Sequence, residues 1–143
     1  MHLPHPWREL RALAHVAVHF DELQLGVWGV NDGRERIWLD ARLSQVERRC
    51  TLAHELVHLW RGHAGCQDER TERLVEADAA RYLLPDPWDV ANELVWSGGD
   101  LEIAADELWV DEPTLRARLD ARHLRPAERA IIVERINRLE VGA

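Results

Sequence analysis

The sequence contains no lysine, and all 18 of its basic residues are arginines. The absence of lysine excludes a Schiff base or a lysine nucleophile from the chemistry of this chain. The two cysteines, Cys50 and Cys66, are too few for a disulfide framework and are not spaced as a CxxC pair. Neither a bilayer-spanning apolar run nor the apolar segment of a signal peptide is present. We therefore expect a cytoplasmic protein with no membrane partner.

Length and composition predict a folded domain. The chain has 143 residues, of which 46% are hydrophobic, and seven tryptophans add large apolar surfaces that can be buried. Residues 1–63 carry eight arginines and eight acidic residues, so the whole net charge of −8 falls on residues 64–143. This acidic balance argues against nucleic acid or an anionic membrane as the main partner.

The first third of the chain predicts one helix followed by two strands. Pro6 suits the first position of a helix, and apolar residues recur at helical spacing as far as His19. Residues 23–30 and 36–40 are rich in residues that favour strands, and Asn31-Asp32-Gly33 between them is a turn signal. We therefore expect a β-hairpin over residues 23–40.

The rest of the chain reads as helices. Ser44 and Glu47 have the spacing of a capping box, and Gly62 is a natural residue to follow the end of the helix that they open. Asp86-Pro87 restarts a helix after Pro85 has ended the preceding one. We expect helices over residues 44–62, 71–84, 86–97, 100–108, 112–122 and 126–140. The most plausible boundary divides a core of residues 1–85 from a helical extension of residues 86–143.

One motif carries chemistry. His54-Glu55-Leu56-Val57-His58 is an HExxH sequence within the capped helix. Residues four apart on a helix share a face, about 6 Å apart along the axis, so both imidazoles can reach one metal ion. Glu55 stands beside them, where it can accept a proton from water that the metal polarises. The motif therefore predicts metal-assisted hydrolysis, with His54 and His58 as ligands and Glu55 as general base.

A catalytic zinc usually has three protein ligands, and the third must be sought elsewhere. The metzincin spacing would place a glycine and a histidine where this chain has Arg61 and Ala64, and His63 lies one residue too early. His63 is therefore expected to support a ligand or to face solvent. Glu72 and Glu76 lie four residues apart on one face of the following predicted helix. Spacing alone leaves both open as the third ligand.

Two stretches resemble the ImmA/IrrE family of zinc metallopeptidases. Residues 49–59, RCTLAHELVHL, are similar to the family's HExxH helix, with Val57 where glycine is common. Residues 76–85, EADAARYLLP, are similar to its second motif, with Asp78 in place of the usual asparagine and Ala80-Arg81 where Phe-Ala is common. The resemblance covers roughly residues 25–125.

The resemblance implies an α+β fold: a zincin-like core with a small β-hairpin or sheet on the HExxH helix and a mostly helical C-terminal extension. It favours Glu76 over Glu72 as the third ligand, and it implies one Zn²⁺ per chain, held with His54 and His58. It further implies an intracellular endopeptidase that cleaves a regulatory protein, such as a helix-turn-helix repressor.

Further roles follow for single residues and for the C-terminal part. Tyr82 could stabilise an oxyanion but is more simply a packing residue, and Asp78 could orient a ligand imidazole. Residues 101–119 read as a helix-turn-helix that could contact DNA through Arg116 and Arg118. Residues 100–143 carry ten acids and seven arginines, so DNA binding is not expected and a packing or docking role is favoured. A metal-containing regulator that binds a repressor without cleaving it remains the other alternative.

Overall fold

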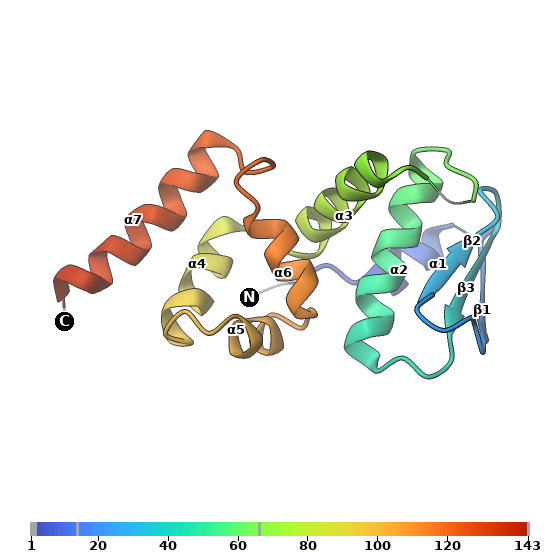
Figure 1. Cartoon of the computed structure of the whole chain (residues 1–143), viewed down its shortest axis with the longest axis horizontal. Coiled ribbons are helices and arrows are strands. Elements are labelled where there is room, and N and C mark those ends of the chain that lie inside the picture. The colour runs from blue at the N-terminus through green and yellow to red at the C-terminus, as the bar shows by residue number, and fades with distance from the viewer. Residues whose placement is uncertain (1–2, 14, 66, 143) are drawn as a thin grey trace.

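The computed structural model describes residues 3–13, 15–65 and 67–142. These residues form a small sheet and a set of helices, with the sheet at one end of the molecule and the C-terminal helix at the other (Figure 1). The elements are α1 (Pro6–Ala12), β1 (Ala17–Asp21), β2 (Gly29–Asn31), β3 (Arg36–Asp40), α2 (Gln45–Trp60), α3 (Glu69–Leu83), α4 (Pro87–Trp96), α5 (Leu101–Glu107), α6 (Glu112–Leu119) and α7 (Pro126–Gly142). The α+β fold is therefore confirmed.

The sheet has the strand order β1-β3-β2. β2 and β3 form the expected antiparallel hairpin, although β2 is only three residues long. Asp32 closes the turn, since its Oδ1 accepts hydrogen bonds of 2.9 to 3.0 Å from the backbone amides of residues 34 to 36. β2 pairs with β3 alone among the described strands, so its outer edge is unpaired.

The helix expected from Pro6 to His19 is too long, because α1 ends at Ala12 and residues 17–21 form β1. β1 runs parallel to β3, with Val18 opposite Ile37 and Phe20 opposite Leu39. This pairing joins segments about twenty residues apart in the chain, so local helical spacing does not reveal it. The strand extends the hairpin to three strands.

Helix α2 lies between the sheet and the helices that follow it, while α1 lies on the sheet side (Figure 1). Its capping box forms as expected: Ser44 Oγ accepts from the Glu47 amide at 3.2 Å, and Glu47 Oε1 accepts from the Ser44 amide at 2.9 Å. One face packs against the sheet and the opposite face against the helices. The sheet-side cluster contains Ile37, Leu39, Leu52 and Leu56. Two buried faces fix α2 firmly, and α2 carries the HExxH motif.

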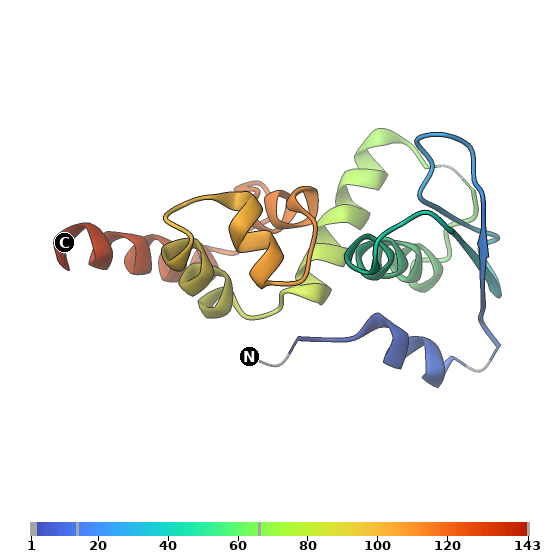
Figure 2. The same cartoon turned by 90° about the horizontal axis from the view of Figure 1, so that it is seen from below.

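The larger apolar cluster lies among α2 to α7. It runs across residue 85, so the helices of the extension pack on those of the core; the boundary between residues 85 and 86 stays a prediction. Asp86 caps α4, with its Oδ1 accepting from the Trp88 amide at 2.8 Å and Pro87 at the first helical position. Helix α7 packs against α4, and in Figure 2 its C-terminal part reaches beyond the other elements.

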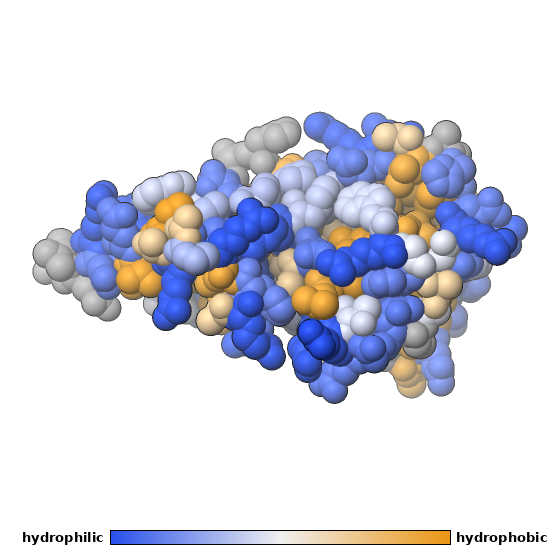
Figure 3. Space-filling model, turned by 90° about the horizontal axis from the view of Figure 1, so that it is seen from above, coloured by the Kyte–Doolittle hydropathy of each residue, from blue (hydrophilic) through white to orange (hydrophobic). Residues whose placement is uncertain are grey.

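The surface of the molecule is mixed. Figure 3 shows hydrophobic areas scattered among hydrophilic side chains on the face seen from above. Within the described residues, no helix combines the length and the apolar character that a membrane crossing requires.

Candidate metal centre

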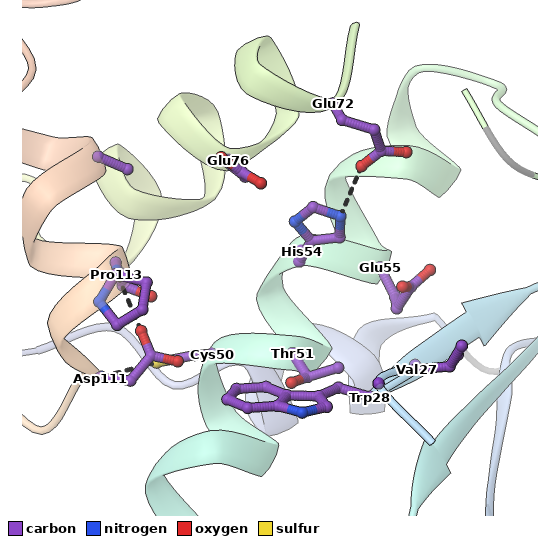
Figure 4. Close-up of a pocket in the computed structure, with 14 residues that line it drawn as sticks. Val27, Trp28, Cys50, Thr51, His54, Glu55, Glu72, Glu76, Asp111 and Pro113 are labelled. Atoms are coloured by element: carbon purple, nitrogen blue, oxygen red, sulfur yellow. Dashed lines mark hydrogen bonds and ion pairs between the residues drawn. The ribbon is translucent and has the colours of Figure 1, made fainter. Parts of the chain in front are cut away.

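Three potential ligand atoms converge between α2 and α3. His54 and His58 lie one turn apart on α2, with their Nε2 atoms 3.2 Å from each other. Glu72, in the first turn of α3, places its Oε2 3.1 Å from His54 Nε2 and 3.2 Å from His58 Nε2. The two nitrogens and the oxygen therefore form a nearly equilateral triangle. Figure 4 shows Glu72 reaching down from α3 to His54.

The size of this triangle fits a tetrahedral zinc ion. Zinc lies about 2.0–2.1 Å from imidazole nitrogen and carboxylate oxygen, so neighbouring ligand atoms stand roughly 3.3 Å apart. Two imidazoles and one carboxylate are a donor set that suits zinc and leave a fourth position open. Among the described residues, His54, His58 and Glu72 are the group whose ligand atoms come together in this way. The arrangement fits a catalytic zinc site of the open type.

The carboxylate in this group is Glu72, whereas the family resemblance favoured Glu76. Asp68 caps α3, so Glu72 falls in the first turn of the helix, level with the HExxH imidazoles. Glu76 lies one turn further along α3 and lines the neighbouring cleft, outside the group of converging ligand atoms. Both carboxylates were open from spacing alone, and the position of α3 beside α2 distinguishes them.

His63 supports His58 from behind. Their Nδ1 atoms are 3.0 Å apart, and the His58 ring is almost fully buried, with 3% of the residue exposed. Gly62, at a φ of +71°, follows the end of α2 as expected and turns the chain back toward that ring. In the tautomer that carries its proton on Nδ1, His58 donates this hydrogen bond to His63 and keeps its lone pair on Nε2, where a metal needs it.

Glu55 is held beside the ligands in a buried position, with only 5% of the residue exposed. Burial raises the pKa of Glu55 to about 7, and the negative charge of Glu72 adds to this, while a hydrogen bond from Asn31 opposes it. Asn31 Nδ2 donates to Glu55 Oε2 at 2.6 Å, and Asn31 Oδ1 accepts from the Gly33 amide at 2.8 Å. Glu55 is therefore a buried carboxylate with a fixed orientation, as a general base requires.

Strand β2 approaches α2 closely at Gly29. A Cβ atom added there would lie 2.6 Å from Thr51 Cγ2 and 3.2 Å from Glu55 Cγ, so only glycine fits. The close approach brings Asn31 within reach of Glu55. In the sequence Asn31 is part of a turn signal, and no local pattern identifies its partner 24 residues away.

A cleft of about 510 Å³ opens beside His54. Its walls come from the loop before β2, from α2, from α3 and from the start of α6, so the C-terminal extension contributes to the site. Figure 4 shows Trp28 on one side, Glu76 on α3 and Pro113 on α6. The lining residues are Gly26, Val27, Trp28, Gly29, Cys50, Thr51, His54, Glu55, Glu72, Glu76, Asp111, Pro113, Thr114 and Ala117.

Two other candidate residues have structural partners instead. Asp78 forms an ion pair with Arg61 rather than orienting a ligand imidazole. Tyr82 packs edge-on against Trp60, with ring centroids 5.6 Å apart, and is not among the cleft residues. Burial raises the pKa of Tyr82 to about 12, as expected for a packed phenol. Tyr82 therefore has a packing role in this structure.

The arginines of the helix-turn-helix segment are also engaged. Arg118 is buried, with 3% exposed, and donates to the Leu84 carbonyl at 2.7 Å and to the Glu128 carboxylate. Arg116 pairs with Glu112 at 2.7 Å on the surface of α6. Arg118 is therefore part of the protein interior in this structure and is not presented to a DNA groove.

Comparison with known proteins gives one match. No curated protein and no solved structure matched the chain significantly. The family model Peptidase_M78, described as the IrrE N-terminal-like domain, matches residues 10–122, which include both HExxH histidines, Glu72 and the whole cleft. Because this match covers most of the chain, the chain belongs to the Peptidase_M78 family, whose membership supports a metallopeptidase-type function.

Proposed function

We propose that this chain is a zinc-dependent endopeptidase that hydrolyses a peptide bond in a regulatory protein. The observation that carries the proposal is the triangle of His54 Nε2, His58 Nε2 and Glu72 Oε2, with sides of 3.1 to 3.2 Å. Beside this triangle stands a buried, oriented carboxylate, and a cleft opens next to it. These are the parts that metal-assisted amide hydrolysis requires.

Each residue has a separate task in this reaction. A zinc ion at the triangle supplies a Lewis acid that polarises the peptide carbonyl and the attacking water. Glu55 accepts the proton of that water as the new C–O bond forms, and delivers a proton to the amide nitrogen as the C–N bond breaks. Asn31 keeps Glu55 pointed at the reacting atoms. His63 holds the His58 ring in place.

Strand β2 is well placed to hold the substrate backbone. Its outer edge is unpaired in the described sheet, and the residues that precede it line the cleft. An extended peptide can add to such an edge through backbone hydrogen bonds, which bind a substrate without selecting its sequence. This mode would bring the scissile bond close to Glu55, because Gly29 contacts the helix at that residue.

A helix-turn-helix repressor as substrate, and a cytoplasmic location for the reaction, belong to the same proposal. Both rest on the likeness of residues 49–59 and 76–85 to the ImmA/IrrE motifs. The adjacent repressor, if one is encoded beside this chain, is therefore the first protein to test, and a general peptide library is the second.

The decisive variant is Glu55→Gln, assayed on two substrates. One is the purified repressor, and the other is a peptide library made by digesting a protein extract with a protease that cuts at glutamate. We expect zinc content to stay at one ion per chain while kcat falls about 10²–10⁴-fold, since the general base is lost. Glu102→Gln, an exposed change on α5, is the matched control and should cleave normally. Cleavage by Glu55→Gln at the wild-type rate would rule out this role.

The same assay distinguishes the non-proteolytic alternative. A regulator that only binds a repressor would cleave neither probe, and its effect in cells would survive Glu55→Gln. The peptidase proposal is supported if the wild-type protein cleaves a probe and if Glu55→Gln loses both this cleavage and the effect in cells.

A further inference from the structure

The cleft carries more negative charge than peptide hydrolysis needs. Four of its described lining side chains are carboxylates, and none is an arginine. Glu72 belongs to the metal-ligand group, and Glu55 is the proposed general base. Glu76 and Asp111 have no task in that chemistry, yet both line the open part of the cleft next to His54.

Neither of these two carboxylates is fully neutralised by the protein. Glu76 takes part in no hydrogen bond or ion pair among the described residues, and burial together with the charge of Glu72 raises its pKa. Asp111 caps α6, with its Oδ1 accepting from the Thr114 amide at 2.8 Å, and its own amide donates to Cys50 Sγ at 3.4 Å. The remaining Asp111 oxygen, Oδ2, has no described partner. Asp111 is therefore fixed in place by the cap, and both carboxylates have acceptor capacity to spare.

Apolar surfaces complete the same space. Trp28 lies along one wall of the cleft with 42% of the residue exposed, and Pro113 of α6 lies on another side of it (Figure 4). Ala117 of α6 also lines the cleft. A long side chain with an apolar stem and a cationic end matches this combination. Its stem can lie along the indole, its charge can interact with the ring face, and its donors can reach the carboxylates.

We propose that the cleft binds an arginine or lysine side chain of the substrate beside the scissile bond, held between Trp28 and the carboxylates of Asp111 and Glu76. The inference rests on the proposed peptidase function, and it names the substrate feature that this site selects. An apolar side chain in this space would desolvate two carboxylates without giving them a partner, and an acidic one would be repelled. Residues 64–143, which hold the whole net charge of −8, also attract a basic segment.

The first test measures binding without cleavage. The probe is a fluorescein-labelled alanine peptide with one central arginine, and its partner peptide has citrulline at the same place, which keeps the shape but removes the charge. We expect zinc-loaded Glu55→Gln protein to bind the arginine peptide about tenfold or more tightly than the citrulline peptide, by fluorescence anisotropy. Equal binding of the two peptides would overturn the proposal.

Substitutions in the cleft test whether Glu76 and Asp111 cause the preference for the arginine peptide. Adding Glu76→Gln and Asp111→Asn should bring the affinity ratio close to one, and the asparagine keeps the cap of α6. The control pair Glu102→Gln with Asp106→Asn removes the same charge from exposed positions on α5 and should leave the ratio unchanged. A ratio that survives the first pair, or that the control pair abolishes, would refute the assignment of this subsite.

A cleavage assay distinguishes the specificity proposal from the peptidase proposal on which it rests. On the peptide library, the wild-type protein should cut next to arginine or lysine, and KM for such sites should rise in the Glu76→Gln, Asp111→Asn protein while kcat changes less. Cutting without enrichment of basic residues would sink the specificity proposal and leave the peptidase intact. If the protein binds the arginine peptide preferentially but cuts no peptide, the peptidase proposal fails and the basic-side-chain subsite stands.

Discussion

Two glutamates with little solvent exposure, Glu55 and Glu128, have pKa values shifted in opposite directions. Glu55 on α2 is 5% exposed and Glu128 on α7 is 7% exposed, so little of either residue reaches solvent, although Glu55 lies deeper among protein atoms. Burial raises the pKa of Glu55 to about 7. Burial also acts to raise the pKa of Glu128, but hydrogen bonds from Arg81, Arg118 and the Arg125 amide outweigh it and lower the pKa to about 2.

Part of the difference between the two pKa values lies in the hydrogen-bond partners. Glu128 accepts from the Arg81 guanidinium at 2.7 and 2.8 Å, from the Arg125 amide at 3.1 Å and from buried Arg118, so its charge is fully compensated. Among the described residues, the Glu55 carboxylate accepts from one neutral donor, the Asn31 side-chain amide. The carboxylate proposed as general base therefore has few partners, whereas the carboxylate that joins α7 to α3 and α6 has several cationic and amide donors.

The largest expected effect is on stability and falls on Glu128. Glu128→Ala leaves the Arg118 charge buried without its carboxylate, so we expect the free energy of unfolding to fall by about 3–5 kcal/mol in urea titrations. Glu112→Ala breaks an exposed pair and should cost at most about 1 kcal/mol. Glu55→Gln removes a poorly solvated carboxylate and should cost little. Equal losses for Glu55 and Glu128 would contradict the contrast between them.

The pH dependence of stability sharpens the same contrast. The pKa of Glu128 lies near its ordinary 4.5 in the unfolded chain and at about 2 in the folded protein. Its stabilisation is therefore complete above pH 4.5 and is lost as the pH falls from 4.5 toward 2. Urea unfolding of zinc-free protein should show this fall, and Glu128→Gln should show a clearly smaller one. An identical pH profile in the variant would remove Glu128 as the cause.

A smaller effect is expected at the metal-ligand group. His63→Ala removes the group that holds the His58 ring, so zinc affinity should fall about 10–100-fold, measured by competition with a chelating dye. His123→Ala, at a histidine outside the zinc-side cleft, is the matched control. Unchanged affinity in His63→Ala would mean that His58 keeps its orientation without this contact.

Much of the helical fold could be predicted because its signals are local. Ser44 with Glu47, Asp86 with Pro87, and Gly62 each fix a helix end within a few residues, and each acts as expected. The strand β1 could not be predicted, because it is stabilised by a partner strand about twenty residues away. Local spacing favoured a helix there.

The candidate site likewise has features that local sequence predicts and features that it does not. The HExxH motif predicts His54, Glu55 and His58 as site residues, and one helical turn brings the two histidines together as that motif requires. The choice between Glu72 and Glu76 depends on how α3 lies across α2, which no local pattern records. Asn31 and its bond to Glu55 were missed for the same reason, and so was the contribution of the C-terminal extension to the cleft.

The measurement that tests the metal centre most directly is zinc affinity in Glu72→Gln beside Glu76→Gln. Each change removes one carboxylate from the same face of α3 and keeps the size of the side chain. Loss of a ligand in Glu72→Gln should weaken binding by more than the ~10–100-fold expected for a supporting group, while Glu76→Gln should bind zinc as the wild type does. Strong zinc binding by Glu72→Gln together with weak binding by Glu76→Gln would contradict the geometry described for this site.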